Sequence, residues 1–450
     1  MQIAIVGFGY IGSVIGAVLA GNGHHVFAID SNQSTVKNLN NGICFIPEPS
    51  LKKMIGRSVE AGLLSASSSY EAVHDCDVIL VTVGTSLSKQ FDPDLSAIAD
   101  VFNNLSKYVK DGQIVMIKST VTPGITRKMT ETYLDGHNIF VGFSPERLAE
   151  GNAIGEFQTL PIIVGGINEL STSKCAEFWS KTLDVEIIKV SSSEAAELIK
   201  LANNQWIDTN IALANEMAML CDSLPYDLDV LEIIEGANSL KKGQHYVNFL
   251  TPSIGVGGYC LTKDPWFLSD LGYKNGRVLK LPSVGRDVND YMPFYCVEKI
   301  LNHLKNTNQA IDSVKIAILG YSFKNNSGDM RFSPMTKFVK SLIQKGFIQI
   351  QIFDRTITDQ EVKGVNVIKC ATWQECVREA DYVVFGTSHE DIESISIPEL
   401  ITFIKHSGVI FDGRRYFSKT EVMDLKKSGL QYIGIGRSFQ SIITKNERES

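Results

Sequence analysis

The sequence predicts an α/β protein in which two doubly wound domains are joined by a helical domain with a long central helix. Short apolar runs alternate with helical stretches over residues 1–193, which is typical of a parallel sheet covered on both faces. Residues 194–222 contain neither Pro nor Gly and are rich in helix formers. The strand–helix alternation returns from residue 313, so the predicted domains span 1–193, 194–305 and 313–450.

Each predicted element follows from its apolar pattern. The expected N-terminal strands are 2–9, 24–30, 77–84, 113–120, 138–145 and 161–166, with a helix over 10–23 after the first strand. The central helices are expected at 194–222, 228–235 and 293–305. The expected C-terminal strands are 314–320, 348–354, 365–370, 382–387, 408–413 and 430–436. The long helix is a candidate dimerisation element, so a homodimer is expected.

Composition narrows the class of protein. A net charge of -7 argues against a nucleic-acid partner, and no apolar run is long enough for a membrane span. The first ten residues do not have the pattern of a signal peptide, so a cytoplasmic protein is expected. The eight cysteines are scattered without a CxxC pair, and most are expected to be reduced, buried hydrophobes. The histidines lack metal-site spacing, so no metal is expected.

A glycine-rich turn after the first predicted strand indicates a dinucleotide site. The segment GFGYIG opens the first helix, and an acid ends the second strand about twenty residues later, as in Rossmann-like domains. An acid at that position accepts a ribose hydroxyl and repels a 2′-phosphate, which favours NAD over NADP. The alternative is that these glycines serve only tight packing. The expected cofactor contacts here are Gly7, Gly9, Tyr10, Ile11, Gly12 and Asp30.

Polar residues at two later strand ends are expected to face the same crevice, because ligands bind at the carboxyl ends of such sheets. These are Thr85 in VGTS and Ser119 and Thr120 in KSTVTPG. Each of them alone is as well explained by turn chemistry.

The segment GVGGYCLTKDP, residues 255–265, surrounds Cys260 with glycines and places Asp264 four residues later. A nucleophilic cysteine beside a bound NAD suits the oxidation of an aldehyde, since a thiolate adduct gives up a hydride and becomes a thioester. The glycines would let a substrate carbon approach the sulfur. Lys200 and Asn204 share one face of the predicted long helix with Glu197, where they could stabilise an alkoxide. Spacing alone favours a solvated helix face instead.

These motifs together resemble the UDP-glucose/GDP-mannose 6-dehydrogenases, the nucleotide-sugar dehydrogenases that make uronic acids. The resemblance runs in order along nearly the whole chain. It includes GFGYIG, EPSL, VGT, STVTPG, SPERLAEG, LPIIVGG, AAELIKLANN, NIALANE, GVGGYCLTKDP, LGYSFKNNSGDMRFSP and FDGRR. It implies two successive NAD-dependent oxidations at C6 of a nucleotide sugar, a role in polysaccharide biosynthesis, and a C-terminal domain that binds the nucleotide diphosphate.

The resemblance also implies a role for each matching residue. Cys260 is the expected nucleophile, Lys200 and Asn204 the oxyanion-stabilising pair, and Asp264 and Thr120 the holders of a catalytic water. Glu150 is the expected base for thioester hydrolysis, with Glu146 as a supporting acid. Further expected cofactor contacts are Thr35, Thr85, Ser119, Thr120, Glu150 and Arg331. The expected substrate contacts are Arg147, Leu148, Lys200, Asn204, Tyr246, Gly257, Phe323, Lys324 and Arg414.

Two departures from the family pattern bear on specificity. Thr35 stands where many relatives have Lys or Arg, and Tyr246 stands where relatives have an arginine that often reaches a partner subunit's substrate. The motifs leave UDP-glucose and UDP-N-acetylhexosamines open as substrates and make GDP-mannose less expected. The alternatives in function are a single-step β-hydroxyacid-type NAD dehydrogenase and a catalytically inactive NAD-binding regulator.

Overall fold

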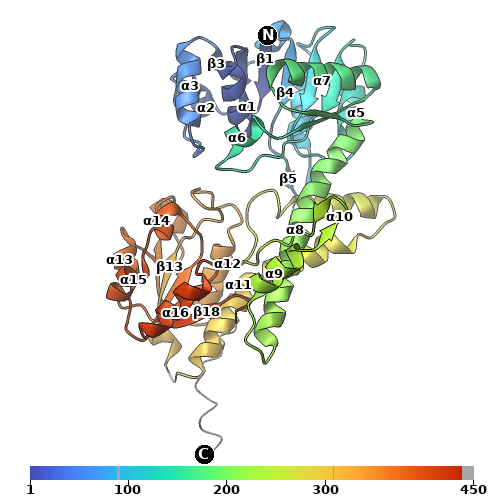
Figure 1. Ribbon diagram of the computed structural model, residues 1–450. Coiled ribbons are helices and arrows are strands. Elements are labelled where there is room, and N and C mark those ends of the chain that lie inside the picture. The colour runs from blue at the N-terminus through green and yellow to red at the C-terminus, as the bar shows by residue number, and fades with distance from the viewer. Residues whose placement is uncertain (89–91, 308, 438–450) are drawn as a thin grey trace, which may run out of the picture. The chain divides into compact units, whose positions relative to one another are not determined.

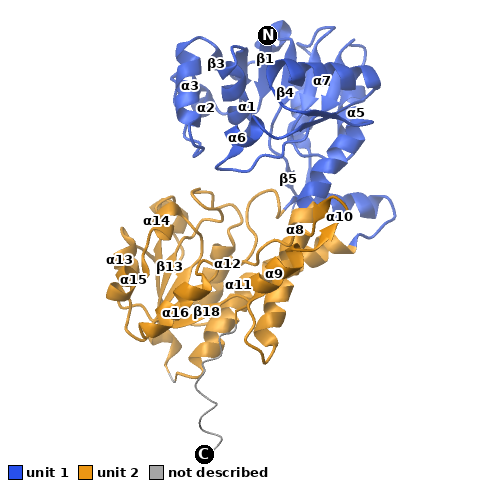
Figure 2. Cartoon of the chain, in the orientation of Figure 1, with its two compact units in different colours: residues 1–204, 263–279 blue, residues 205–262, 280–450 orange. Residues whose placement is uncertain are grey.

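The computed structural model describes residues 1–88, 92–307 and 309–437. The chain divides into two compact units (Figure 2). The first unit comprises residues 1–204 and 263–279, and the second comprises 205–262 and 280–450. The long helix α8 (Ser193–Ser223) begins in the first unit and ends in the second. The central segment is therefore divided between the units, and the three-domain boundaries given above remain a prediction.

The first unit is built on an eight-stranded sheet with the order β10-β9-β8-β7-β4-β1-β2-β3. Its strands are β1 (Gln2–Val6), β2 (His25–Ile29), β3 (Leu64–Ser67), β4 (Val78–Val81), β7 (Ile114–Ile117), β8 (Phe140–Phe143), β9 (Ile162–Gly166) and β10 (Ile187–Lys189). The pairs are parallel except β8 with β9, which is antiparallel. The expectation of a wholly parallel sheet is corrected there, because an apolar run predicts burial and not strand direction.

The eight-stranded sheet lies between two layers of helices (Figure 1). In the first unit, Ile3 and Ile5 point to one layer while Ala4 and Val6 point to the other. One layer holds α1 (Tyr10–Gly21), α2 (Gln33–Asn40), α3 (Leu51–Glu60), α6 (Ala153–Phe157) and α7 (Glu169–Thr182). The other holds η1 (Glu71–Asp75), α4 (Ser96–Leu105) and α5 (Ile125–Tyr133). Helix α10 (Asp264–Lys274) and the short pair β5 (Ser86–Leu87) and β6 (Pro93–Asp94) complete the unit.

The second unit contains a six-stranded parallel sheet with the order β15-β14-β13-β16-β17-β18. Its strands are β13 (Lys315–Leu319), β14 (Gln349–Phe353), β15 (Ile368–Lys369), β16 (Tyr382–Phe385), β17 (Val409–Asp412) and β18 (Gln431–Gly434). One face packs against α8, α9 (Val230–Asn238), α11 (Lys280–Leu304) and α12 (Pro334–Gln344). The other packs against α13 (Trp373–Val377), α14 (Glu390–Glu393), α15 (Ile397–Phe403) and α16 (Lys419–Lys427). The remaining elements are η2 (Ile311–Ser313), η3 (Asp359–Val362), β11 (Lys241–Lys242) and β12 (His245–Tyr246).

The helix expected at 293–305 is longer than the sequence indicated. Helix α11 begins at Lys280 and runs through Pro293. Met292, Pro293 and Cys296 are all buried, so packing of this face outweighs the local cost of a proline in the helix. Over residues 1–88, 92–307 and 309–437, every helix is too short or too polar to span a membrane.

Candidate functional site

The turn between β1 and α1 forms a cradle for an anion. Gly7 adopts φ +88°, and its N–H donates to the Ile29 carbonyl at 2.8 Å. A Cβ at Gly12 would lie 2.3 Å from the Gly7 oxygen, so this turn requires glycine there. A Cβ at Gly9 would meet no described atom within 4 Å. The open side of this turn therefore faces the N-terminus of α1, where backbone N–H groups favour a phosphate.

Asp30 follows β2 and holds the same turn. Its Oδ2 accepts the Phe8 N–H and its Oδ1 accepts the Asn32 N–H, both at 2.9 Å. The carboxylate is half-buried and retains lone pairs for a ribose hydroxyl. Thr35 lies one turn into α2, and its N–H is held by the Asn32 side chain at 3.3 Å. The residues around this cradle fit the pyrophosphate and one ribose of NAD.

Tyr10 has a structural partner that the sequence did not reveal. Its hydroxyl donates to Glu48, which also accepts the Gly151 N–H at 2.7 Å and is 6% exposed. Burial raises the pKa of Tyr10, as does the hydrogen bond to Glu48. Glu48 belongs to the EPSL motif, but the motif alone does not indicate that its acid contacts Tyr10. The pair ties the start of α1 to the loop that contains Glu150.

A chain of polar contacts joins four sequence-predicted residues in the first unit. The Asn204 amide donates to Asp264 Oδ2 at 2.5 Å. Asp264 Oδ1 lies 2.7 Å from Lys263 Nζ, which donates to the Thr85 hydroxyl at 3.3 Å. The Thr85 hydroxyl donates to the Thr120 carbonyl at 2.8 Å. Lys263 is 4% exposed and was missed, although it stands beside Asp264 in the quoted motif.

A second pair brings Lys200 to Glu146. The two side chains are nearly buried, and Nζ lies 3.4 Å from the carboxylate. Glu146 also accepts the Leu148 N–H, while the Leu148 side chain packs against the core. Arg147 donates to the Pro161 carbonyl. The Ser119 hydroxyl donates to the Val81 carbonyl at 3.3 Å, and Glu150 is half-buried.

Two buried ionisable groups support this region. Lys118 donates to the carbonyl and hydroxyl of Ser144 at 3.1 and 3.4 Å, and its Nζ lies 4.9 Å from the Trp179 ring centroid. Burial lowers the pKa of Lys118 to about 8. Glu197 on α8 accepts the Gly124 N–H at 2.6 Å and the N–H and hydroxyl of Thr126 at 2.8 and 2.6 Å. Burial raises its pKa to about 7. Glu197 thus fixes the STVTPG loop to the helix that carries Lys200.

Cys260 belongs to the second unit and is unlike the other cysteines. All eight lie within the described residues; seven are buried and Cys260 is exposed. The neighbouring glycines are required by packing. A Cβ at Gly257 would lie 2.6 Å from the Phe323 Cβ, and one at Gly258 would lie 2.7 Å from the Phe323 ring. Gly255 has φ +139° and lies against Pro334. These glycines therefore let the cysteine loop dock on residues 323–334, and the expectation that they also leave room for substrate remains a prediction.

A buried ion pair holds the other side of the cysteine loop. Arg286 on α11 donates to Asp208 at 2.6 Å and to the Leu261 carbonyl at 3.4 Å. Its other terminal nitrogen donates to Asp290 at 2.6 Å. Arg286 is 1% exposed, so its contact with Leu261 fixes the backbone next to Cys260. The sequence offered no signal for Arg286 beyond its basic character.

The remaining predicted substrate contacts and the predicted cofactor contact Arg331 also lie in the second unit. Arg414 donates to the carbonyls of Gly386 and Phe323 at 2.8 and 2.9 Å, and so pins the loop that carries Lys324. Arg331 pairs with Asp329 and lies over the Tyr259 ring, 5.6 Å from its centroid. Tyr246 is 63% exposed on the small β11–β12 hairpin.

The turn after β13 is filled by side chains of the second unit itself, which bind its backbone N–H groups. Asp354 follows β14 and accepts the N–H groups of Tyr321 and Ser322 at 2.8 and 2.9 Å. It also contacts His389 Nε2 at 3.0 Å and is 2% exposed. His389 Nδ1 accepts the Asn326 N–H at 2.8 Å, which places the proton on Nε2. Hydrogen bonds from His389 and Thr356 hold the pKa of Asp354 well below its ordinary value despite burial.

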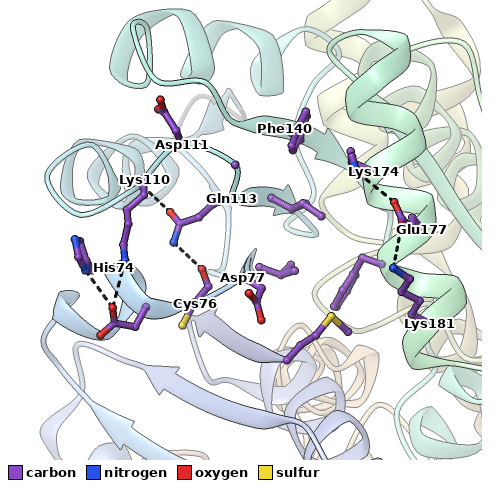
Figure 3. A pocket seen from close by; sticks show the side chains of 16 residues that line it. His74, Cys76, Asp77, Lys110, Asp111, Gln113, Phe140, Lys174, Glu177 and Lys181 are labelled. Carbon is purple, nitrogen blue, oxygen red and sulfur yellow. Dashed lines mark hydrogen bonds and ion pairs between the residues drawn. The ribbon is translucent and has the colours of Figure 1, made fainter.

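A hollow of about 530 Å³ lies at the other end of the first sheet, at the amino ends of β4, β7 and β8 (Figure 3). Figure 3 shows Lys174 and Lys181 both reaching Glu177 on α7. Lys110 pairs with Asp75 at 3.3 Å. Ligands of doubly wound sheets bind at the carboxyl ends, and the charges here neutralise one another, so this hollow is not the candidate site.

Comparison with known proteins places these features in one family. Its three descriptions match in order: the UDP-glucose/GDP-mannose dehydrogenase family NAD binding domain over residues 1–183, the central domain over 194–291 and the UDP binding domain over 317–419. A UDP-N-acetyl-D-mannosamine dehydrogenase of Pyrococcus horikoshii is 29% identical over 443 residues, covering 97% of this chain and 99% of that protein. One from Methanococcus maripaludis is 31% identical over 418 residues, covering 91% and 92%.

Solved structures agree with this placement. The UDP-D-ManNAc dehydrogenase of Pyrococcus horikoshii superposes with a TM-score of 0.86 at 29% identity, covering 97% of this chain and 99% of that chain. A UDP-glucose dehydrogenase of Pyrobaculum islandicum gives a TM-score of 0.84 at 25% identity, covering 97% and 98%. The predicted fold class and the predicted NAD cofactor are confirmed. The chain belongs to the UDP-glucose/GDP-mannose dehydrogenase family and is an NAD-dependent nucleotide-sugar dehydrogenase.

Proposed function

We propose that this enzyme oxidises C6 of UDP-N-acetyl-D-mannosamine to the carboxylate in two NAD-dependent steps through a thioester on Cys260. The observation that carries the proposal is the exposure of Cys260 alone among eight cysteines, on a loop held from two sides. A cysteine used only for packing is buried, whereas a nucleophile must reach its substrate. The names of the relatives favour an N-acetylmannosamine sugar over glucose.

The proposed chemistry assigns each step to residues of this chain. When bound, NAD accepts one hydride in each oxidation. In the first oxidation the C6 hydroxyl releases its proton to a water held by Asp264 and Thr120, and an aldehyde forms. The Cys260 thiolate then adds to the aldehyde carbon, and the adduct becomes a thioester when its hydride leaves. Water, deprotonated by Glu150, cleaves the thioester, releasing the carboxylate and the Cys260 thiol.

Lys200 and Asn204 are proposed to stabilise the oxygen that carries negative charge in each step. The Asn204 amide is held by Asp264, and the Lys200 ammonium faces Glu146, so both donors are oriented before substrate binds. Donors that are already oriented stabilise a developing oxyanion without reorganisation. Arg331 is proposed to contact NAD, and Lys324 and Arg414 the nucleotide diphosphate.

A substrate screen with a stoichiometry measurement tests this proposal. The enzyme is incubated with NAD and UDP-ManNAc, UDP-GlcNAc, UDP-GalNAc, UDP-glucose or GDP-mannose, and NADH absorbance is followed to completion. UDP-ManNAc is expected to react with the highest kcat/KM and to yield two NADH per sugar. One NADH per sugar would support the single-step dehydrogenase, and no NADH with any sugar would support the inactive regulator.

We also propose that the enzyme is a homodimer that pairs through α8. Trp206, Leu213 and Leu220 recur every seven residues on this helix and are 40–49% exposed. An apolar stripe at this spacing is typical of a helix that packs against another helix. Light scattering is expected to give twice the mass of the chain, and Leu213→Glu is expected to give the monomer. Met423→Glu, at a site on α16 that is 55% exposed, is the control that should remain dimeric.

A further inference from the structure

Glu48 is a buried acid that the proposed mechanism does not use. It lies just before α3 and is 6% exposed. One of its carboxylate oxygens accepts the Tyr10 hydroxyl and also the Gly151 N–H at 2.7 Å, and the other oxygen accepts the Ile154 N–H at 3.4 Å. The two N–H groups belong to residues 103 and 106 positions away. Glu48 therefore fixes a distant loop, and these donors offset the cost of burying a carboxylate.

The loop that Glu48 holds contains Glu150, the proposed base. Gly151 follows Glu150 directly and adopts φ +87°, a backbone conformation that favours glycine, while its N–H is bound by Glu48. On the other side of Glu150, the Ala149 N–H donates to the Glu156 carboxylate at 2.5 Å. The backbone on both sides of Glu150 is therefore held by an acid. The Glu150 side chain itself is half-buried.

Tyr10 orients the Glu48 carboxylate. It is the first residue of α1, next to the turn that fits the pyrophosphate of NAD. Its hydroxyl oxygen also lies 3.2 Å from the Gly151 nitrogen, so the three groups form one network within the first unit. Burial raises the pKa of Tyr10, as does the hydrogen bond to Glu48, so the phenol keeps its proton and Glu48 remains the acceptor. This network joins the start of α1 to the loop of the base.

We propose that Glu48 is a positioning residue for thioester hydrolysis, which places the Glu150 carboxylate through the backbone of Gly151. The inference rests on the proposed function, since it assumes a thioester on Cys260 and Glu150 as the base. In this step one proton of the water passes to Glu150 and the water oxygen adds to the thioester carbon. The carbon–sulfur bond then breaks, the sulfur leaves with the proton from Glu150 as the thiol, and the new acid releases its remaining proton to solvent.

Hydrolysis is the step that loss of Glu48 should slow. A displacement of about 1 Å in a catalytic group can cost about a hundredfold in rate. In the proposed mechanism Glu150 acts only on the hydrolytic water, and no electrons pass to NAD in that step. The two hydride transfers should therefore proceed in a variant without Glu48, and the enzyme should stop at the acyl-enzyme.

Acid-quench mass spectrometry of the full-length enzyme tests this inference. Glu48→Ala removes the acceptor of the Gly151 N–H. The variant is mixed with saturating NAD and UDP-ManNAc, NADH is followed from the first turnover, and quenched samples are weighed as intact protein. We expect a burst of two NADH per active site and then a steady rate at least about tenfold below that of wild type. During the steady phase most of the protein should carry the oxidised sugar nucleotide as an acyl group on Cys260.

Three further variants separate positioning from folding. Glu48→Gln keeps an oxygen for the Gly151 N–H and the Tyr10 hydroxyl, so it should restore most of the turnover. Tyr10→Phe removes only the hydroxyl that orients Glu48 and should accumulate less of the same acyl-enzyme. Glu60→Ala, at the exposed end of α3, is the control with wild-type kinetics. Should Glu48→Ala fail to fold, Tyr10→Phe decides in its place.

Glu150→Gln in the same assay distinguishes this inference from the proposed function. Acyl-enzyme that accumulates in both Glu150→Gln and Glu48→Ala supports the positioning role. Accumulation in Glu150→Gln alone would overturn that role and leave the proposed function intact. A Glu48→Ala enzyme that slows all NADH formation without acyl-enzyme, or that Glu48→Gln does not rescue, would show a purely structural role and would also overturn it. No acyl-enzyme in Glu150→Gln would overturn the proposed hydrolysis step and this inference together.

Discussion

The first turns of the two sheets begin alike and end differently. Gly7 and Gly320 both follow the first strand of their sheet with φ near +85°. In the first unit, α1 begins three residues later at Tyr10, and Asp30 is half-buried. In the second unit, α12 does not begin until Pro334, and Asp354 is buried by its own loop and by His389.

The difference shows how one layout serves two ligands. The short turn of the first unit leaves an open helix N-terminus and an acid with free lone pairs, as a dinucleotide requires. The longer segment 320–333 of the second unit uses its acid internally, and Lys324 in this segment is the residue proposed to bind the nucleotide diphosphate. The absence of a second GxGxxG thus corresponds to a turn that is already closed. The following predictions test this division, from the largest effect to the smallest.

Cys260→Ser is expected to separate chemistry from cofactor binding. A serine hydroxyl is a poor nucleophile without a strong base, so overall turnover should fall by about three orders of magnitude or more. NAD binding, which belongs to the other unit, should keep its Kd. Steady-state NADH formation and a fluorescence titration with NAD measure the two effects. Cys44→Ser is the control with both values unchanged, and near-normal turnover of Cys260→Ser would rule out the thioester.

The paired variants Asp354→Ala and Asp30→Ala are expected to affect different properties. The first should lower stability, and the second should weaken NAD binding. Loss of buried Asp354 leaves several donors unpaired and should lower the free energy of unfolding by about 3 kcal/mol, with NAD affinity unchanged. Loss of Asp30 should weaken NAD binding about tenfold and reduce the preference over NADP, with a smaller effect on stability. Urea unfolding and NAD titrations distinguish the two. An NAD affinity that depended on Asp354 would contradict the comparison.

The free energy of unfolding is expected to depend on pH in opposite directions through two acids, Glu197 and Asp354. The pKa of Glu197 is raised to about 7, so its contribution is fully present below its ordinary value of 4.5 and is lost as pH rises through 7. The pKa of Asp354 is lowered, so its contribution is present above its ordinary value and is lost as pH falls. The unfolding free energy of wild type minus that of Glu197→Gln should fall by up to about 3 kcal/mol between pH 4.5 and 8.

The matched comparison for that pH series is Asp354→Asn. Its difference from wild type should stay level between pH 4.5 and 8 and should shrink only at lower pH. If the difference in unfolding free energy between wild type and Glu197→Gln did not change over the same pH range, the pKa of Glu197 would not be raised, and this prediction would be wrong.

Two glycine variants are expected to give the smallest effects. Alanine at Gly9 fits the fold but fills the cradle, so NAD affinity should fall about tenfold with unchanged stability. Alanine at Gly257 would lie 2.6 Å from the Phe323 Cβ and should shift the cysteine loop. It should lower kcat several-fold and leave NAD affinity unchanged. An effect of Gly257→Ala on NAD affinity alone would contradict the assignment of this glycine to loop packing.

Much of this molecule could be predicted from local patterns. The strands after which Gly7 and Gly320 occur are continuous apolar runs, and the segment 193–223 lacks helix breakers, so these elements were expected close to their observed limits. Strands β3 and β10 were missed because LSAS and IIK are too short or too polar to stand out. Helix α11 was predicted too short because Pro293 was given its usual weight, whereas tertiary packing decides there.

Residues that the family resemblance assigns to the site could be predicted even where they are far apart in sequence, whereas the buried residues that support them could not. Asp264 and Asn204 were expected, and they meet. Glu48, Lys118 and Arg286 contact residues up to 106 positions away or within buried networks, and no spacing rule indicates such contacts. The packing of the glycines near Cys260 against segment 323–334 could not be predicted from the motif, and their role in leaving room for substrate stays a prediction.

The docking of the cysteine loop on Phe323, Phe332 and Pro334 is expected to constrain the evolution of this segment. One short stretch of chain packs against the cysteine loop and also contains Lys324, the basic group proposed for the nucleotide. An insertion or deletion there would displace both at once, whereas the hairpin that carries Tyr246 can vary independently. The length of 323–334 is therefore expected to be under stronger constraint than the length of the hairpin.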